Sequence, residues 1–78
     1  MERAITLIKV DPRIEKQVLE EIRSIRGVKE VHYLYGPYDI SALIEVKSLE
    51  EMEDLILNRI REIYGVSTSM TCYIANDR

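Results

Sequence analysis

The sequence contains no tryptophan or phenylalanine, only three glycines and two prolines, and a single cysteine, Cys72. A lone cysteine cannot form an intramolecular disulfide, and it belongs to no Cys/His spacing that binds structural zinc. The unpaired thiol suits a reducing compartment, so we expect a cytoplasmic protein. A chain of 78 residues has a small core. Without disulfides or metals, self-association is the remaining way to stabilise it further.

Long apolar runs and an excess of basic charge are also missing. No stretch approaches the ~20 apolar residues that span a bilayer, and the first residues show no signal-peptide pattern. The 11 basic residues are scattered among 14 acidic ones, which gives a formal net charge of −3. We therefore expect neither a membrane nor a nucleic acid as a direct partner. Glu and Ile are abundant while Gln and Asn are scarce, a bias found in proteins of thermophiles, among others.

Catalytic and cofactor motifs are absent as well. The sequence has no GxGxxG, no Walker A loop and no paired carboxylates of a common enzyme type. His32 is the only histidine, and no Ser, Cys or second metal ligand lies at a spacing that would form a dyad or a metal site. We expect no catalytic residue, no metal and no cofactor, and we interpret the chain as something other than an enzyme.

Strand and helix patterns alternate regularly along the chain. Strand patterns cover residues 3–10, 28–35, 40–46 and 66–74, and helix patterns cover 12–25 and 49–64. Asp11 before Pro12 and the capping box that starts at Ser48 are typical helix starts, and Gly27 and Gly65 follow the two helices. The order predicts one α+β domain over residues 1–78. It is a ferredoxin-like βαββαβ fold with two helices on one face of a four-stranded antiparallel sheet.

Apolar side chains occupy both faces of the predicted strands. Ile40, Ala42 and Ile44 alternate toward one side, where the helices cover them, while Leu43 points to the other. An uncovered face with large apolar residues usually marks an interface. We therefore expect dimerisation through the sheets, with Tyr33, Tyr35 and Leu43 at the interface. In the alternative, the tyrosines form a partly solvent-exposed surface of a monomer.

Two segments offer the groups that an amino-acid ligand needs. In the turn Gly36-Pro37-Tyr38-Asp39, a carboxylate could pair with an ammonium group, and the hydroxyls of Ser69 and Thr71 could bind a carboxylate. The alternative is an ordinary hairpin turn followed by a threonine-rich strand.

In order and spacing, these segments resemble a known family. Tyr35-Gly36-x-Tyr38-Asp39, followed by Gly65-Val66-x-x-Ser69-x-Thr71, is similar to the ligand-binding (RAM) domain of the Lrp/AsnC transcription regulators, and the resemblance covers nearly the whole chain. It implies a stand-alone form without the helix-turn-helix, a dimer that assembles further, and a free amino acid as effector. It also implies that a full-length Lrp/AsnC regulator could be a partner. Gly36, Tyr38 and Asp39 match the effector loop, and Ser69 and Thr71 match the hydroxyl positions.

Our leading hypothesis is therefore an amino-acid-binding, self-associating sensor or transcriptional co-regulator module. Two alternatives share the topology: a small dimeric α/β-barrel enzyme of the monooxygenase-like type, and an ACT-like amino-acid-binding module. An enzyme needs a hollow lined by polar groups between the facing sheets, whereas a sensor has that space packed and its site at the hairpin edge.

Overall fold

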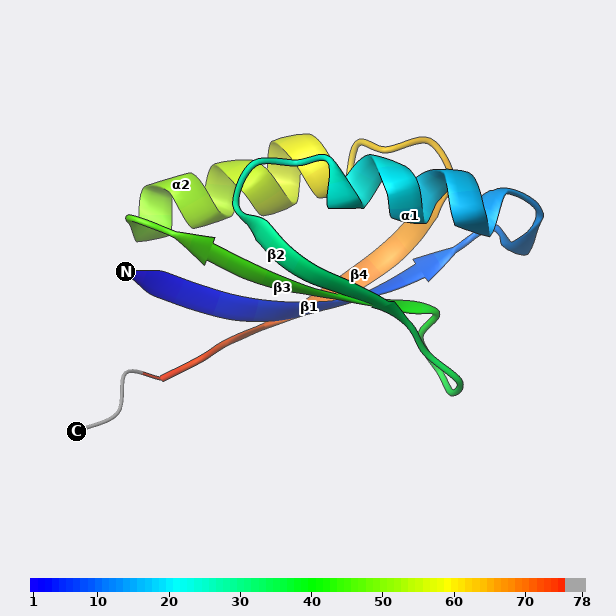
Figure 1. Cartoon of the computed structure of the whole chain (residues 1–78), viewed down its shortest axis with the longest axis horizontal. Helices are drawn as coiled ribbons and strands as arrows, with labels where there is room; N and C mark the ends of the chain where they lie inside the picture. The colour runs from blue at the N-terminus through cyan, green and yellow to red at the C-terminus, as the bar shows by residue number, and fades with distance from the viewer. Residues whose placement is uncertain (76–78) are drawn as a thin grey trace.

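The computed structural model describes residues 1–75. Its elements are, in chain order, β1 (Glu2–Val10), the 3-10 helix η1 (Pro12–Ile14), α1 (Glu15–Arg23), β2 (Val28–Tyr33), β3 (Ile40–Val46), α2 (Leu49–Asp54), the π-helix η2 (Leu55–Ile60) and β4 (Val66–Tyr73). The strands form one antiparallel sheet in the order β2-β3-β1-β4. Both helical segments cover the same face of this sheet (Figure 1). The predicted ferredoxin-like βαββαβ fold is confirmed.

Side-chain alternation along β1 and β3 builds the core. Ala4, Thr6 and Ile8 face the helices from β1, and the buried residues of β3 lie beside them in register, with Thr6 opposite Ala42. The helices contribute further buried side chains, namely Val18, Leu19, Ile22, Met52, Leu55, Ile56 and Ile60. The Oγ1 atoms of Thr6 and Thr71 are 3.0 Å apart, so the hydroxyl of buried Thr6 has a hydrogen-bond partner.

The helix starts follow the sequence signals. Asp11 Oδ1 accepts a hydrogen bond from the Arg13 backbone N–H at 2.9 Å, and Ser48 Oγ accepts one from Glu51 N–H at 3.1 Å. Both are N-cap bonds that satisfy free amides of the first turn. Hydrogen bonds from the Arg13 side chain are the main reason why the pKa of Asp11 lies below its ordinary value.

The second helix differs from the prediction in its second half. Residues 55–60 form a π-helix in place of an α-helix, and the backbone N–H of Arg61 donates to the carbonyl of Ile56, five residues earlier, at 3.0 Å. The apolar spacing of Met52, Ile56 and Ile60 suits either helix type, so the pattern gave no sign of the wider turn.

Gly65 allows the end of the second helix to touch the first helix. Its φ is +103°, and a Cβ at this position would lie 2.5 Å from Ile14 Cδ1. Gly27 (φ +102°) has the corresponding place after α1, where a Cβ would lie 2.9 Å from Leu55 Cδ1. The two glycines therefore fix how closely each half of the fold approaches the other.

We expect Gly65→Ala to lower the free energy of unfolding by roughly 2 to 5 kcal/mol, because backbone strain and overpacking add. Gly36→Ala is the matched control: its φ is +146°, but a Cβ there meets nothing within 4 Å. The control should cost only the strain, about 1 to 3 kcal/mol. Urea unfolding of both variants measures the difference, and equal losses would contradict the packing argument.

Candidate functional site

The face of the sheet away from the helices has an apolar centre and is uncovered by any element of residues 1–75 (Figure 1). Ile5 of β1 pairs with Leu43 of β3 and with Cys72 of β4, and Leu7 pairs with Met70. Ile5 and Met70 are 41% and 44% exposed. We call this surface the open face, formed by Ile5, Leu7, Leu43, Met70 and Cys72.

Contrary to the prediction, Tyr33 and Leu43 do not lie on the same face of the sheet, while the dimer interface itself stays a prediction. Tyr33 pairs with Ile40, which is fully buried beneath the helices, so Tyr33 lies on the helix side and Leu43 on the open face. Tyr35 lies beyond the end of β2 and is fully exposed. The sequence could not decide this, because strand 28–35 has apolar residues at both alternating sets of positions. Its face was fixed only by pairing with β3.

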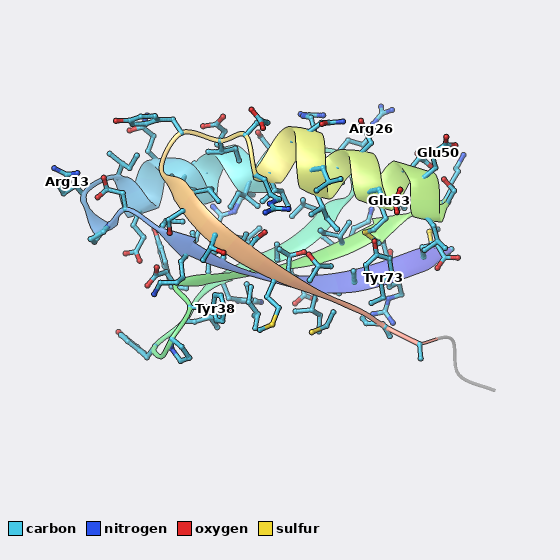
Figure 2. The ribbon with its side chains drawn as sticks, turned by 180° about the vertical axis from the view of Figure 1, so that it is seen from behind. Arg13, Arg26, Tyr38, Glu50, Glu53 and Tyr73 are labelled. Carbon is cyan, nitrogen blue, oxygen red and sulfur yellow. The ribbon has the colours of Figure 1, made fainter. Side chains whose placement is uncertain are left out.

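The hairpin loop that carries Gly36, Tyr38 and Asp39 is attached to the end of β1. Asp39 Oδ2 accepts a hydrogen bond from Val10 N–H at 2.9 Å, and Asp39 N–H donates to the Ile8 carbonyl at 2.9 Å. Lys9 Nζ donates to the Pro37 carbonyl at 2.9 Å. Figure 2 shows Tyr38 on the side of the sheet away from the helices. The Asp39 carboxylate thus replaces the strand neighbour that Val10 lacks where β3 begins.

Ser69 and Thr71 lie elsewhere, on the helix side of β4. They pair with Ile8 and Thr6 of β1, and their side chains line a cavity of about 280 Å³ between β4 and the second helix. We call this cavity the β4 groove, lined by Glu53, Ile56, Leu57, Arg61, Ser69, Thr71 and Tyr73. Its polar groups are three hydroxyls, one guanidinium and one carboxylate. In Figure 2, Glu53 and Tyr73 lie at the same end of the groove.

Strand β1 separates the two predicted parts of the site within one chain. Ile8 pairs with Ile40 on one side and with Ser69 on the other, so two strand spacings, roughly 10 Å, lie between the hairpin end and the groove. The ammonium and carboxylate of an α-amino acid are bonded to the same carbon. One chain therefore does not bring Asp39 and the Ser69 and Thr71 hydroxyls to a single free amino acid.

Glu53 and Arg61 were not predicted as site residues. Their charges agree with the helix dipole, which was a sufficient explanation for them in the sequence. The usable signal is their spacing, because Glu53, Leu57 and Arg61 recur every four residues and share one side of a helix. Only the fold shows that this side lies over the hydroxyl-bearing residues of β4.

None of the helices within residues 1–75 is both long and apolar enough to cross a bilayer. In the same part of the chain, no three His, Cys, Asp or Glu residues gather in an arrangement that could hold a metal ion.

A four-stranded antiparallel sheet with two helices on one face places the chain in the ferredoxin-like class of α+β domains. The chain belongs to the Lrp/AsnC ligand binding domain family, whose model matches residues 3–76. This match confirms the resemblance found in the sequence.

Relatives and solved structures agree with this assignment. An uncharacterized HTH-type transcriptional regulator of Pyrococcus furiosus is 37% identical over 71 residues, which are 87% of this chain and 47% of that protein. The chain thus spans about half the length of this curated relative. A crystal structure of a Thermus thermophilus protein has a TM-score of 0.94 at 29% identity and covers 100% of this chain and 98% of that chain. A feast or famine regulatory protein from M. tuberculosis, complexed with L-methionine, shares the fold with a TM-score of 0.81 at 24% identity, covering 99% of this chain and 52% of that chain.

We expect Asp39→Ala to lower the free energy of unfolding by about 1 to 3 kcal/mol, because Val10 N–H loses a charged acceptor. Asp39→Asn keeps a carbonyl oxygen at the same place and should lose less. Chemical denaturation of both variants tests the attachment of the hairpin. An Asp39→Ala protein as stable as the parent would show that this hydrogen bond contributes nothing.

Proposed function

We propose that this domain binds a free amino acid in the β4 groove and acts as a self-associating regulatory module. The observation that carries the proposal is the lining of the groove, where the Arg61 guanidinium shares a cavity with the Ser69 and Thr71 hydroxyls and with two apolar side chains. A guanidinium and hydroxyl groups are suitable donors for an α-carboxylate. Ile56 and Leu57 offer an apolar surface for a side chain.

The choice of ligand class follows from this lining. An amino acid with an apolar side chain would place its carboxylate at Arg61 and its side chain against Ile56 and Leu57. The regulator from M. tuberculosis, which shares the fold, was solved with L-methionine. L-methionine is therefore the first ligand to test on this chain.

The hairpin residues Gly36, Tyr38 and Asp39 remain proposed ligand residues through a neighbouring copy. Within one chain, β1 keeps them away from the groove, and Asp39 Oδ2 already accepts the Val10 N–H. If the hairpin of a neighbouring copy contributes, Asp39→Ala should weaken amino-acid binding in addition to lowering stability. An unchanged affinity would restrict Asp39 to its structural role.

The expected change in affinity is largest at Arg61. Arg61→Ala removes a charge-assisted hydrogen bond of about 1.5 to 3 kcal/mol, so the Kd for L-methionine should rise roughly tenfold to a hundredfold. Arg59→Ala is the control, since Arg59 is on the same helix but does not line the groove. Isothermal titration calorimetry of the parent and both variants decides the assignment, which fails if Arg61→Ala and Arg59→Ala bind alike.

We also propose that the open face is covered by a second copy. Ile5, Leu7, Leu43 and Met70 form a continuous apolar surface, and burying it against the same surface of another chain would remove it from water. This packing favours a sensor over the dimeric barrel enzyme, because apolar side chains would fill the space where a catalytic hollow is needed. If a full-length Lrp/AsnC regulator is a partner, this domain would then act on it as an assembly of copies.

Leu43→Asp should split this dimer, because a carboxylate in the packed interface would be desolvated without a partner at a cost of several kcal/mol. Leu49→Asp is the control, as Leu49 is 52% exposed at the start of α2 and does not belong to the open face. Sedimentation velocity of both variants measures their mass. A Leu43→Asp protein that keeps the mass of the parent would refute the open-face dimer.

A further inference from the structure

A second cavity lies beside the second helix, away from the β4 groove. It is bounded by the loop that follows α1, the start of β2, the end of β3 and the second helix. Its volume is about 660 Å³, against about 280 Å³ for the β4 groove, and the two share no lining residue. We call it the α2 cavity; its apolar part is formed by Gly27, Val46 and Leu55. These three lie against one another, because a Cβ at Gly27 would be 2.9 Å from Leu55 Cδ1 and 3.0 Å from Val46 Cγ1.

Basic side chains from four segments of the chain line the α2 cavity. They are Arg26 in the loop after α1, Lys29 on β2, Lys47 after β3 and Arg59 on the second helix. None of these four forms an ion pair with another of residues 1–75. Cations that share a cavity repel one another, so their convergence has no explanation in the stability of the fold.

Carboxylates also line the α2 cavity, but each is stabilised by a group other than these cations. Glu45 forms an ion pair with Arg3 at 3.1 Å, and Asp54 Oδ1 accepts a hydrogen bond from Asn58 Nδ2 at 2.8 Å. The other two are glutamates in the first turn of α2, where the helix dipole stabilises a negative charge. The cavity therefore has cations without ion-pair partners, which favours an anionic ligand.

Two irregularities of the backbone border the α2 cavity, and each contributes a cation. The register between β2 and β3 shifts between Val28 and Glu30, so Lys29 is the extra residue of a β-bulge. Residues 55–60, which include Arg59, form the π-helix. β-Bulges redirect side chains and, like short π-helices, occur often at functional sites. Their meeting at one cavity supports a binding role for it.

We propose that the α2 cavity binds a nucleoside phosphate. Such a molecule has a counterpart for each part of the lining. Its phosphate oxygens suit the guanidinium and ammonium groups, and its base suits the apolar surface. Its ribose hydroxyls and exocyclic amino group are donors for carboxylates such as that of Glu50. Figure 2 shows Arg26 and Glu50 toward the end of the molecule where the second helix begins.

Simpler anions would use only part of this lining. Inorganic phosphate leaves the apolar surface in water, a fatty acid has no donor for the carboxylates, and a free amino acid has one carboxylate for four cations. The phosphates belong near Arg26 and Lys47, because Glu45 N–H donates to the Gly27 carbonyl at 2.8 Å and so holds their two segments together. The site does not depend on amino-acid binding in the β4 groove, which has other residues.

Isothermal titration calorimetry with ADP and with GDP tests the site, and two bases are used so that a preference for one does not hide it. Arg26→Ala and Lys47→Ala each remove a cation, so each should raise the Kd at least about tenfold. Arg23→Ala is the matched control, because Arg23 pairs with Glu20 at 3.0 Å and does not line the cavity. Its Kd should equal that of the parent. No binding of either nucleotide to the parent, or equal Kd values for Arg26→Ala and Arg23→Ala, would overturn the proposal.

Fragments of the ligand separate the parts of the site. The monophosphate of the bound nucleotide should bind more weakly than the diphosphate, because fewer charges face the cations. The nucleoside alone and inorganic pyrophosphate alone should each bind at least about tenfold more weakly than the diphosphate. Pyrophosphate that binds as tightly as the diphosphate would refute the nucleoside part of the proposal. A nucleoside that binds as tightly would refute the role of the cations.

Chemical-shift mapping by NMR locates the ligand in the parent protein without any substitution. On addition of the bound nucleotide, the amide signals of residues 26–29 and 45–47 should shift, while those of Ser69 and Thr71 should keep their positions. Shifts confined to β4 would place the nucleotide in the β4 groove and refute the α2 cavity as its site.

Discussion

Strand β1 is the element on which the rest of the molecule depends, because this central strand joins edge strand β4 to β3. Its pairing with β3 and β4 fixes which side chains of all three strands face the helices. Ala4, Thr6 and Ile8 are fully buried, while Ile5 and Leu7 form the middle of the open face. A shift of one residue in one of these registers would turn the side chains of the shifted strand to the opposite face of the sheet, so its buried residues would leave the core. The core and the proposed interface thus both follow from the alternation of side chains between the two faces of the sheet.

The same strand explains why the candidate ligand groups form two separate sets. β3 begins at Ile40, so Val10 at the end of β1 has no strand partner on that side, and the Asp39 carboxylate takes this place. On the other side, β4 carries its hydroxyls toward the second helix. A carboxylate that completes the hydrogen bonding of a central strand has a structural reason to be present. Its occurrence in a ligand-binding motif is therefore no measure of how much it contributes to binding.

Much of the fold was predictable because the helix-capping residues and the alternation of apolar side chains along the strands indicated the same elements. The residues of β3 were predicted without error, and both helix starts have their expected caps. Strand 28–35 was different, since either of its faces could have been buried, and the wrong face was chosen for Tyr33. The β4 groove could not be predicted from the sequence for another reason. Ser69 and Thr71 were visible as hydroxyls, but Arg61 becomes part of their surroundings only when the second helix is placed over β4. The spacing of Glu53, Leu57 and Arg61 shows that they share one side of the helix, but what this side contacts depends on how the elements pack.

The position of the groove at an edge of the sheet has a physical consequence for any function that it has. Residues in the middle of a sheet use their backbone groups for neighbouring strands, so they can offer a ligand or partner only their side chains. Ser69, Thr71 and Tyr73 offer both, because β4 has β1 on one side only. A small domain has few such places, and the charges of β2 protect its other edge. A ligand at β4 can therefore use backbone and side-chain groups together, which is not possible at a central strand.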